Sequence, residues 1–514
     1  MKGQQYNTHE HFAGTPDVCL LLEGSYPFVS GGVSSWMHNL IRSLPDITFS
    51  AVCLLASATE EHQLKYTLPP NFRIDNIVYI HDPEPFWKDR FASISKKDHA
   101  HLLALHARMG EASPELLGAV LKGFRQGHYP VRELIHGRKA WDLMVQQYER
   151  SGNEDSFIDY FWTYRFTHLP LFRLLLSEIP EARLYHALST GYAGFLGALA
   201  AVQTGRPLLL TEHGIYTKER KIEIAQAEWI ARKASTRLSI EKELGTYQQF
   251  WVRMFQTLGQ FTYRLAKCII TLYDGNRQLE LEEGAADEKI LIIPNGIRLE
   301  RFENLKPATG PDPQQARFVI GFVGRIVPIK DVKTFIRACR TVSLELPNIE
   351  VRIMGPTEED PDYFEDCLEL VSLLHMESIV RFTGRVNITD HFPELDVVVL
   401  TSISEAQPLA IMEANCAGIP VVASDVGACR ELVEGRTPED KALGPSGVVT
   451  RIASPEDTAR GILHILTNPD VRTAMCHAGR ERVRTYYREE DLNERYRILY
   501  HTYMEQEDDA PWRA

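Results

Sequence analysis

Short apolar runs that alternate with longer helical patterns constrain the fold of this chain more than any other feature of its sequence. The first series of runs covers 18–22, 50–55, 77–80, 183–187, 207–211, 267–272 and 290–293. The second series covers 318–323, 349–354, 379–383, 396–401, 419–423 and 447–450. Because these runs are apolar nearly throughout, they are typical of strands that are covered on both faces. The alternation therefore predicts the α/β class, with parallel sheets built from strand–helix–strand units.

The two series of runs indicate two doubly wound domains. Residues 304–316 are rich in proline, glycine and polar side chains, which is typical of a linker. We therefore expect an amino-terminal domain over 1–303 and a carboxyl-terminal domain over 317–485. Residues 84–180 interrupt the first series with helical, aromatic-rich sequence, and we interpret them as an insertion for docking or for the acceptor side. Residues 486–514 predict a last helix, which we expect to pack back on the amino-terminal domain.

Charge and composition exclude several classes of function. The formal net charge is -13, whereas a nucleic-acid-binding protein usually carries a basic surface, so no nucleic-acid partner is expected. None of the eight cysteines forms a CxxC pair and most stand in apolar runs, which favours reduced core cysteines in a cytosolic protein. The most apolar stretch, 191–202, is too short to span a bilayer, and the polar amino terminus lacks the apolar segment of a secretory signal.

The histidine-rich segments do not have the spacing of metal ligands. His99, His101 and His106 do not share one face of a helix, and the "HEH" at 9–11 stands in a polar tail. A zinc site needs three or four ligands that converge on one point. We therefore expect no metal site.

Two glycines and a histidine follow predicted strands of the amino-terminal domain. Gly31 and Gly32 precede an amphipathic helix, whose start Ser34 or Ser35 can cap. A helix amino terminus after a glycine pair suits an anion, although a simple tight turn is the alternative. His213 lies at the carboxyl end of another run, where active-site residues gather in α/β folds. The alternative is a histidine that hydrogen-bonds its own loop.

Two cations follow the first run of the carboxyl-terminal domain. Arg325 and Lys330 come after 318–323 and before a helix that the apolar spacing of 331–342 predicts. Arginine offers a fork of donors and lysine a compact charge, so the two suit a diphosphate at a strand end. The alternative is ordinary surface charge.

Glu405 and Glu413 flank the start of a short helix that we expect to run from Pro408 to Gly418. The buried stripe of this helix is predicted to hold Leu409, Met412 and Cys416. Glu413 borders that stripe, one turn after its first member. Carboxylates accept hydrogen bonds from neutral hydroxyls, as sugar and ribose recognition requires. Alternatively, Glu413 pairs with a nearby arginine, and Glu405 is a charge at the helix start.

In this order, these motifs resemble the retaining GT-B glycosyltransferases of family 4. That family has a Gly-Gly loop, a TxHG-like turn, a GRxxxxK motif and two glutamates separated by seven residues. The corresponding residues here are Gly31-Gly32, His213-Gly214, Arg325 with Lys330, and Glu405 with Glu413. The resemblance implies two Rossmann-like domains that face a cleft. Within the family, "EGSYPFVSGGVSSW", "TEHGIYTKER" and "SEAQPLAIMEA" are similar to the soluble Pel exopolysaccharide glycosyltransferases.

The resemblance implies how the donor is held. Arg325 and Lys330 would neutralise its diphosphate, assisted by the backbone of Gly31 and Gly32 from the other domain. Preorganised cations of this kind stabilise the charge that develops on the leaving group. Glu413 would accept the ribose hydroxyls.

The resemblance also implies contacts to the sugar and the base. Glu405 would hold hydroxyls of the transferred sugar, and His213 would lie beside the reacting sugar and the acceptor. The base would meet the backbone at Arg385 and Val386, after the run 379–383.

The chain departs from the family beside the first glutamate, where the family has Gly-Phe-Gly and this chain has Ala406-Gln407-Pro408. Proline has no N–H and donates no hydrogen bond to a phosphate. The backbone amides of Gln407 and Leu409 would therefore take over that contact.

The family resemblance implies a retaining transferase that moves a hexose or N-acetylhexosamine from a UDP-sugar to a growing Pel-type exopolysaccharide, without a cofactor or metal. Its partners would be the donor, the polysaccharide acceptor and inner-membrane export subunits. The chain would be cytoplasmic, or peripheral at the inner membrane through those partners. The alternatives are a glycogen- or starch-synthase-like glucosyltransferase that uses ADP-glucose, and a non-catalytic nucleotide-sugar-binding subunit of a membrane export complex.

Overall fold

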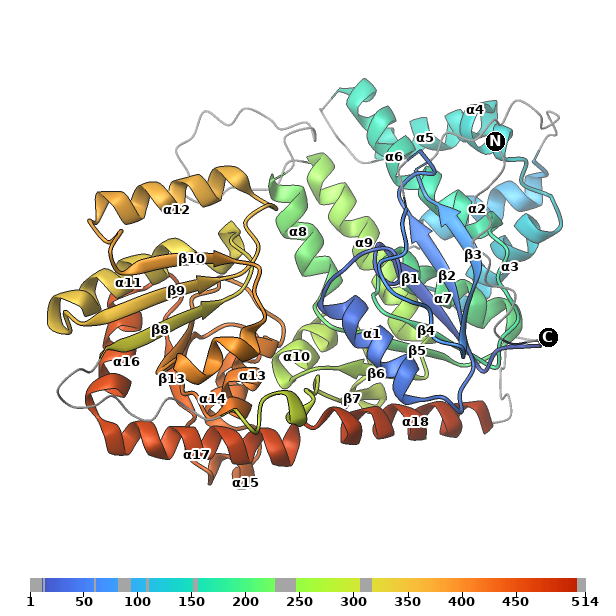
Figure 1. Cartoon of the computed structure of the whole chain (residues 1–514). Helices are drawn as coiled ribbons and strands as arrows, with labels where there is room; N and C mark the ends of the chain where they lie inside the picture. Colours follow the sequence, from blue (N-terminus) through green and yellow to red (C-terminus); the bar gives the residue numbers. More distant parts are fainter. Residues whose placement is uncertain are drawn as a thin grey trace. The chain divides into compact units, whose positions relative to one another are not determined.

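The computed structural model describes residue 12 and residues 14–59, 62–81, 94–107, 111–150, 156–226, 246–305 and 317–505 (Figure 1). The chain divides into two compact units. The first unit comprises 1–271, 277–291 and 496–514, and the second comprises 272–276 and 292–495. Helices α10 (Asp274–Glu282) and α18 (Glu489–Glu505) have residues in both units.

Every run of the first series forms a strand of one seven-stranded sheet, as predicted. The strands are β1 (Val18–Glu23), β2 (Phe49–Leu55), β3 (Phe72–Tyr79), β4 (Leu184–Ala187), β5 (Leu208–Glu212), β6 (Cys268–Thr271) and β7 (Ile290–Ile292). Their order is β3-β2-β1-β4-β5-β6-β7, and the pairings from β3 to β6 are parallel. Successive strands leave in opposite directions from β1 and β4. In such sheets the crevice at the carboxyl ends of these two strands is where ligands bind.

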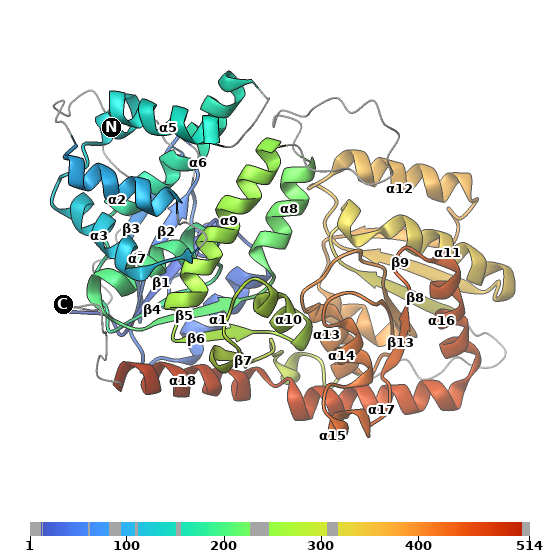
Figure 2. The ribbon, with the colours of Figure 1, turned by 180° about the vertical axis from the view of Figure 1, so that it is seen from behind.

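The helices of the first unit other than those between β3 and β4 are α1 (Gly32–Ser43), α7 (Tyr192–Thr204), α8 (Tyr216–Gln226) and α9 (Thr246–Leu265), together with part of α10 and of α18. The apolar stretch at 191–202 forms α7, which packs on β1, β4 and β5 (Figure 2). A Cβ atom at Gly197 would lie 2.6 Å from Cδ1 of Leu208. The small residues of α7 therefore allow the close packing on the sheet that the sequence predicts.

The described residues between β3 and β4 are mainly helical, as expected for the insertion. Its helices are α2 (Lys96–Ala107), α3 (Pro114–Arg125), α4 (Val131–His136), α5 (Arg138–Arg150) and α6 (Phe157–Leu176). Aromatic side chains join them, such as Trp141 and Phe157 with ring centroids 5.5 Å apart. The insertion thus contributes to the same hydrophobic core as the sheet of the first unit.

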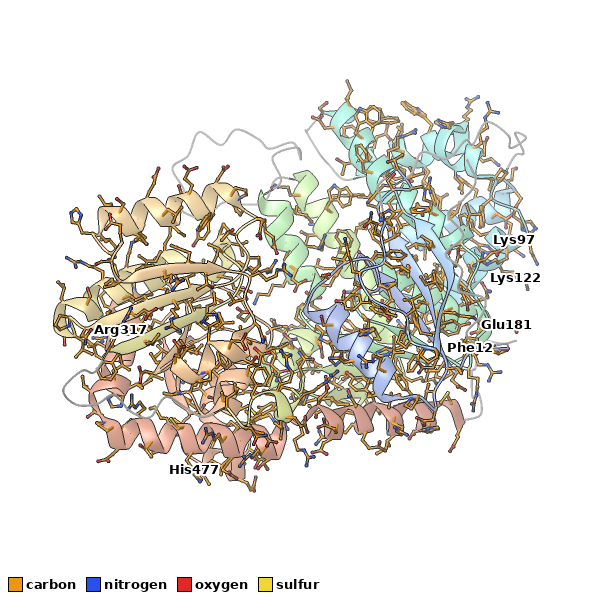
Figure 3. All side chains as sticks on the ribbon, in the orientation of Figure 1. Phe12, Lys97, Lys122, Glu181, Arg317 and His477 are labelled. Atoms are coloured by element: carbon orange, nitrogen blue, oxygen red, sulfur yellow. The ribbon has the colours of Figure 1, made fainter. Side chains whose placement is uncertain are left out.

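The second series of runs forms a six-stranded parallel sheet in the second unit. The strands are β8 (Phe318–Val323), β9 (Ile349–Met354), β10 (Val380–Gly384), β11 (Val397–Leu400), β12 (Val421–Ser424) and β13 (Gly447–Thr450). Their order, β10-β9-β8-β11-β12-β13, reverses at β8 and β11. At the amino end of β8, Arg317 forms an ion pair with Glu350 at 2.7 Å (Figure 3). Both units are therefore Rossmann-like, as predicted.

The second sheet is covered on both faces, which explains why its strands read as continuous apolar runs. In β11, Val397 and Val399 contribute to one hydrophobic core, whereas Val398 and Leu400 contribute to the other. Alternate residues of a strand point to opposite faces, so both faces require apolar side chains. The helices of this unit are α11 (Val332–Glu345), α12 (Pro361–Leu373), α13 (Leu409–Ala417), α14 (Cys429–Glu434), α15 (Pro438–Lys441), α16 (Pro455–Thr467) and α17 (Pro469–Tyr486).

The structure corrects the domain boundaries. Residues 292–303, which we assigned to the amino-terminal domain, belong to the second unit. The linker at 304–316 falls mostly outside the described residues. The last helix, α18, contributes Tyr496 and Tyr500 to the first unit, where their ring centroids lie 5.3 Å from Trp36 and 5.8 Å from Phe49.

Seven of the eight cysteines are buried and all are free, as the sequence indicates. Within the described ranges, histidine, cysteine and carboxylate side chains form no cluster that suits a metal ion, and the "HEH" at 9–11 lies outside those ranges. Each helix in the described part of the chain is too short or too polar to span a bilayer.

Candidate functional site

Arg325 follows β8 at the carboxyl edge of the second sheet. Its guanidinium is half exposed and donates to the carboxylate of Glu359, with Nη1 and Oε2 2.6 Å apart. At the same edge, a Cβ atom at Gly355 would lie 1.9 Å from the carbonyl oxygen of Gly324, so this glycine lets the ends of β8 and β9 approach. An exposed ion pair contributes little to stability, about 0–1 kcal/mol. Arg325 can therefore exchange Glu359 for an anionic ligand at small cost.

Lys330 and Glu405 form an ion pair that the sequence did not predict. Nζ of Lys330 lies 2.5 Å from Oε1 of Glu405, and both side chains are mostly buried. Oγ of Ser402 donates to the same carboxylate oxygen at 2.6 Å. The backbone of Lys330 is also fixed, because its carbonyl oxygen accepts a hydrogen bond from the hydroxyl of Thr401. The lysine and the glutamate, which we assigned to different parts of a donor, are thus adjacent.

The loop before α13 is fixed by its own contacts. The side chain of Gln407 is buried, and its Oε1 accepts a hydrogen bond from the backbone N–H of Asn295 at 2.6 Å. Gly427 has a φ of +54°, and a Cβ atom there would lie 2.2 Å from the carbonyl oxygen of Glu405. These contacts hold the loop in place. The contact that we predicted between a phosphate and the backbone amides of Gln407 and Leu409 stays a prediction.

Helix α13 begins one residue later and ends one residue earlier than predicted. It begins at Leu409, with Pro408 as the residue before its first turn, and ends before Gly418, which has a φ of +77°. Met412 and Cys416 are buried as predicted, but the side chain of Leu409 is 37% exposed. Leu409 therefore does not belong to the buried stripe, because it opens the helix at the edge of the sheet.

Glu413 carries a carboxylate that no described donor satisfies. Within the part of the chain that the structure describes, no hydrogen bond or ion pair reaches it. Burial raises the pKa of Glu413 to about 7, and the charge of Arg301 opposes that rise. Since the carboxylate is only partly shielded from solvent, it is accessible to a ligand that donates hydrogen bonds. The pairing of Glu413 with an arginine, our alternative, is limited to this electrostatic influence of Arg301.

Val386 lies just beyond β10 and is partly buried against a hydrophobic core of the second unit. It follows Gly384, whose φ is +68°, and the exposed Arg385. Val386 thus lies beyond a strand's carboxyl end, and its contact with the base stays a prediction.

In the first unit, the glycine pair opens α1 differently from our expectation. Gly31 is the residue before the helix, and Gly32 is its first residue. Ser34 and Ser35 lie inside the first turn, so neither caps the helix; Ser35 bonds instead to the hydroxyl of Tyr66, at 3.1 Å. A Cβ atom on either glycine would meet no atom within 4 Å. The start of α1 is therefore open to solvent or to a ligand.

His213 directly follows β5, as predicted. Its ring lies edge-on to Trp36, with ring centroids 4.4 Å apart. Burial lowers the pKa of His213 to about 4, so the imidazole is neutral near pH 7. Its Nε2 is shielded from solvent and has no partner among the described residues, which excludes the hydrogen bond to its own loop that we had considered.

The sequence analysis missed Glu23 and Tyr216. Glu23 is the last residue of β1, and Oε1 of its carboxylate accepts a hydrogen bond from the hydroxyl of Tyr216 at 2.6 Å. The signal was present as a carboxylate that ends the apolar run "VCLLLEG". We ended the predicted strand at residue 22 and included Glu23 only in the segment "EGSYPFVSGGVSSW", without assigning it a role.

Comparison with protein families assigns most of the chain. Residues 16–288, more than half of it, match the family described as a domain of unknown function (DUF3492). Residues 317–468 match the family described as glycosyl transferases group 1. The two matches fall on the two units in turn.

Curated relatives share less than a third of their residues with this chain. D-inositol 3-phosphate glycosyltransferase of Kineococcus radiotolerans is 28% identical over 324 residues, which cover 59% of this chain and 68% of the relative. The protein of the same name from Streptosporangium roseum is 25% identical over 309 residues, 58% of this chain and 65% of the relative. A third, from Streptomyces scabiei, is 28% identical over 261 residues, 48% of this chain and 53% of the relative. The chain thus spans between about half and two thirds of the length of these relatives.

Solved structures support the fold over almost the entire chain. Sucrose-phosphate synthase of Thermosynechococcus elongatus aligns with a TM-score of 0.56 at 16% identity, over 94% of this chain and 98% of that protein. HepE of Anabaena, in complex with UDP and glucose, aligns with a TM-score of 0.56 at 16% identity, over 95% of this chain and all of that protein. Both share the GT-B arrangement of two Rossmann-like domains. The chain therefore belongs to the DUF3492 family, with a GT-B fold whose second unit is a group 1 glycosyltransferase domain.

Proposed function

We propose that this chain is a retaining glycosyltransferase of family 4 that transfers a hexose or N-acetylhexosamine from a UDP-sugar to a growing exopolysaccharide of the Pel type, in the manner of PelF. The observation that carries the proposal is the unsatisfied carboxylate of Glu413 in the same unit as the Lys330–Glu405 pair. The names of the relatives support transfer of a sugar, and the complexes of HepE with UDP and with UDP-glucose support a uridine nucleotide. The similarity of three segments to the Pel enzymes supports the polymer.

The second unit would hold the donor. Lys330 has three N–H donors, and only one is needed for Glu405, so the others are available for the diphosphate. The free oxygen of Glu405 would accept a hydroxyl of the sugar, and Glu413 would accept the ribose hydroxyls. Arg325 would leave Glu359 for the diphosphate, because that exposed pair is weak. These cations would stabilise the dianionic leaving group without a metal ion.

The transfer step breaks the bond between the sugar C1 and the diphosphate oxygen. The new bond would form on the same face of the sugar, with the acceptor's proton passing to the departing phosphate. A neutral His213 would lie beside the reacting sugar and the acceptor. The sugar gains positive character in the transition state, while the negative charge develops beside Lys330 and Arg325.

The sharpest test replaces the two cations and measures donor binding and turnover. We expect Lys330→Gln and Arg325→Ala to lower the release of free nucleotide in the presence of acceptor by about 100-fold, in line with the loss of one preorganised charge contact. Lys330→Gln retains a donor for Glu405, so the fold should survive. The matched control is Lys333→Ala, which removes a lysine of the same unit that pairs with Asp366 at 2.6 Å. Wild-type rates in both cation variants would refute the proposal.

A panel of donors separates the proposal from its alternatives. Release of UDP from UDP-sugars supports a Pel-type enzyme, whereas release of ADP from ADP-glucose alone indicates a glucan synthase. Binding of a nucleotide sugar by calorimetry without any turnover indicates a non-catalytic subunit. The same panel in the presence of a metal chelator tests the metal-independent reaction.

We also propose that the chain acts at the cytoplasmic face of the inner membrane, bound to export subunits of the exopolysaccharide system. The resemblance to the Pel enzymes is the support for this placement. Fractionation of cells with and without those membrane proteins tests it, because the chain should leave the membrane fraction when they are absent.

A further inference from the structure

The first unit contains a cavity of about 560 Å³ at the carboxyl edge of its sheet. Its floor is formed by the carboxyl ends of β1, β2 and β3, and its walls come from α6 of the insertion and from α7, α8 and α9. Representative lining residues are Glu23, Leu54, Ile80, Phe166, Tyr216 and Trp251. A volume of this size is typical of small-molecule sites. The cavity includes the end of β1, one of the two strands where the strand order reverses and where ligands bind in such sheets.

Glu23 presents a fixed carboxylate to this cavity. Oε1 accepts the hydroxyl of Tyr216 at 2.6 Å, and Oε2 accepts the backbone N–H of Ala193 at 3.2 Å, in the first turn of α7. Burial raises the pKa of Glu23 above its ordinary value, and the hydrogen bonds from Tyr216 and Ala193 oppose that rise. A carboxylate has about four sites that accept hydrogen bonds. The backbone N–H of Tyr192 and the charge of Arg220 also act on this carboxylate, and its remaining capacity to accept hydrogen bonds is available to a ligand.

The aromatic side chains in the walls of the cavity are held in place by contacts with one another and with the backbone. The ring of Tyr216 packs on the backbone of Gly191, where a Cβ atom would lie 2.3 Å from the ring. Phe255 meets that ring edge-on at 5.5 Å, and the guanidinium of Arg220 lies 5.0 Å from its centre. Trp251 continues the wall, with its ring centroid 6.1 Å from that of Phe255. The result is a set of flat aromatic surfaces around the carboxylate of Glu23, with the guanidinium of Arg220 as a second charged group in the lining.

We propose that this cavity binds a neutral pyranose unit of the acceptor, with Glu23 accepting two adjacent hydroxyls and the aromatic rings covering the C–H face of the sugar. This assignment rests on the proposed transferase function and names the acceptor class. A purely apolar ligand would bury the carboxylate of Glu23 without hydrogen bonds, which is costly. The negative charge of Glu23 is offset by the guanidinium of Arg220, which also lines the cavity, so the lining has no net charge that would favour an ionic ligand. A neutral sugar satisfies both the carboxylate and the apolar walls.

The experiment measures binding of neutral sugars to the full chain by saturation-transfer NMR. The probes are the methyl pyranosides of glucose, galactose and mannose and of their 2-acetamido forms. We expect at least one to bind the wild-type chain, and Glu23→Gln to weaken that binding at least tenfold, because the amide replaces one acceptor by a donor. Tyr216→Phe keeps the ring but removes the hydroxyl that positions Glu23, and it should weaken binding by a smaller factor.

The control variant is Glu181→Gln, since Glu181 is exposed near the amino end of β4, away from the carboxyl edge of the sheet (Figure 3). It should bind the pyranosides as the wild type does. The proposal is overturned if no pyranoside binds the wild type, or if Glu23→Gln and Glu181→Gln bind equally well. Calorimetry with UDP-sugars on the same variants separates the two ideas. If the wild type binds a UDP-sugar but no pyranoside, only this inference is rejected. If the wild type binds no UDP-sugar, the proposed function is rejected.

Discussion

Replacement of Glu413 by glutamine should make the protein more stable and its donor affinity weaker. The carboxylate of Glu413 lacks a partner among the described residues, and burial raises its pKa from 4.5 to about 7. The folded state therefore binds this proton more tightly than the unfolded chain does. The free energy of unfolding then falls as the pH rises from 4.5 through about 7, because the unfolded chain loses the proton first. Glutamine has no charge to bury and escapes this cost.

The magnitude follows from the two pKa values. A rise from 4.5 to about 7 corresponds to about 3 kcal/mol of lost stability at pH 8, and to less than about 1 kcal/mol at pH 5. Solvent reaches part of the carboxylate, and screening brings the expected gain for Glu413→Gln at pH 8 to between about 1 and 3 kcal/mol. The gain should shrink towards pH 5. Binding of a UDP-sugar should weaken at least tenfold, because the amide group is a poorer acceptor for the ribose hydroxyls.

The assay uses the distribution of tryptophan. All seven tryptophans belong to the first unit by sequence, so their fluorescence reports on that unit, while far-ultraviolet circular dichroism reports on both. Urea unfolding at pH 5 and pH 8 should show a higher midpoint for Glu413→Gln in circular dichroism at pH 8. The fluorescence transition should move less. The control is Glu369→Gln, which removes a negative charge from an exposed position on α12 and should change neither stability nor donor binding.

The reasoning is refuted if Glu413→Gln is equally or less stable than the wild type at pH 8. It is also refuted if the gain in stability does not depend on pH, because a gain from packing alone would be the same at pH 5. If the variant is more stable at pH 8 but binds the donor as the wild type does, the electrostatic argument stands and the role of Glu413 in donor binding is rejected.

Two further predictions concern the second and the first unit. Arg482→Met should lower the stability of the second unit by about 3–5 kcal/mol, which would appear as a lower urea midpoint. The reason is that the buried guanidinium donates to Asp440 at 2.6 Å and to the carbonyl oxygens of Val433 and Gly444. An unchanged midpoint would contradict this. His213→Phe should lower kcat without shifting the pH profile between pH 5.5 and 8, because the pKa of His213 is about 4 and the imidazole does not titrate in that range; a profile that shifts in the variant would show that His213 exchanges a proton there.

The strands could be predicted from sequence because they are buried on both faces. Val397 to Leu400 read as one apolar run, and the structure assigns alternate members to the two cores. The order of strands in each sheet could not be read from such runs, since continuous apolar sequence carries no information on which strand is the neighbour. The expectation of a Rossmann-like order came from the strand–helix alternation and from the resemblance.

The contacts within the site depended on that missing order. Lys330 follows β8 and Glu405 follows β11, and these strands are neighbours in the sheet although 75 residues separate the two side chains along the chain. The sequence predicted each residue at a strand end but not the ion pair between them. The exposure of Leu409 was missed although the start of the helix was predicted to within one residue, because helical spacing does not show what packs against the first turn.

Burial alone does not distinguish a ligand-binding carboxylate from a structural one, but access to solvent and hydrogen-bond supply do. Glu212, in β5, is fully buried, and its two oxygens accept hydrogen bonds from Tyr263 at 2.5 Å and Thr190 at 2.9 Å. Its donors come from the protein, and it does not line the cavity beside Glu23, so we interpret it as fixing local structure. Glu23 and Glu413 are shielded yet reachable, and each keeps acceptor sites that the described protein leaves unused. Both carboxylates carry a cost in stability that rises with pH, and our two proposals assign that cost to the binding of hydroxyl groups.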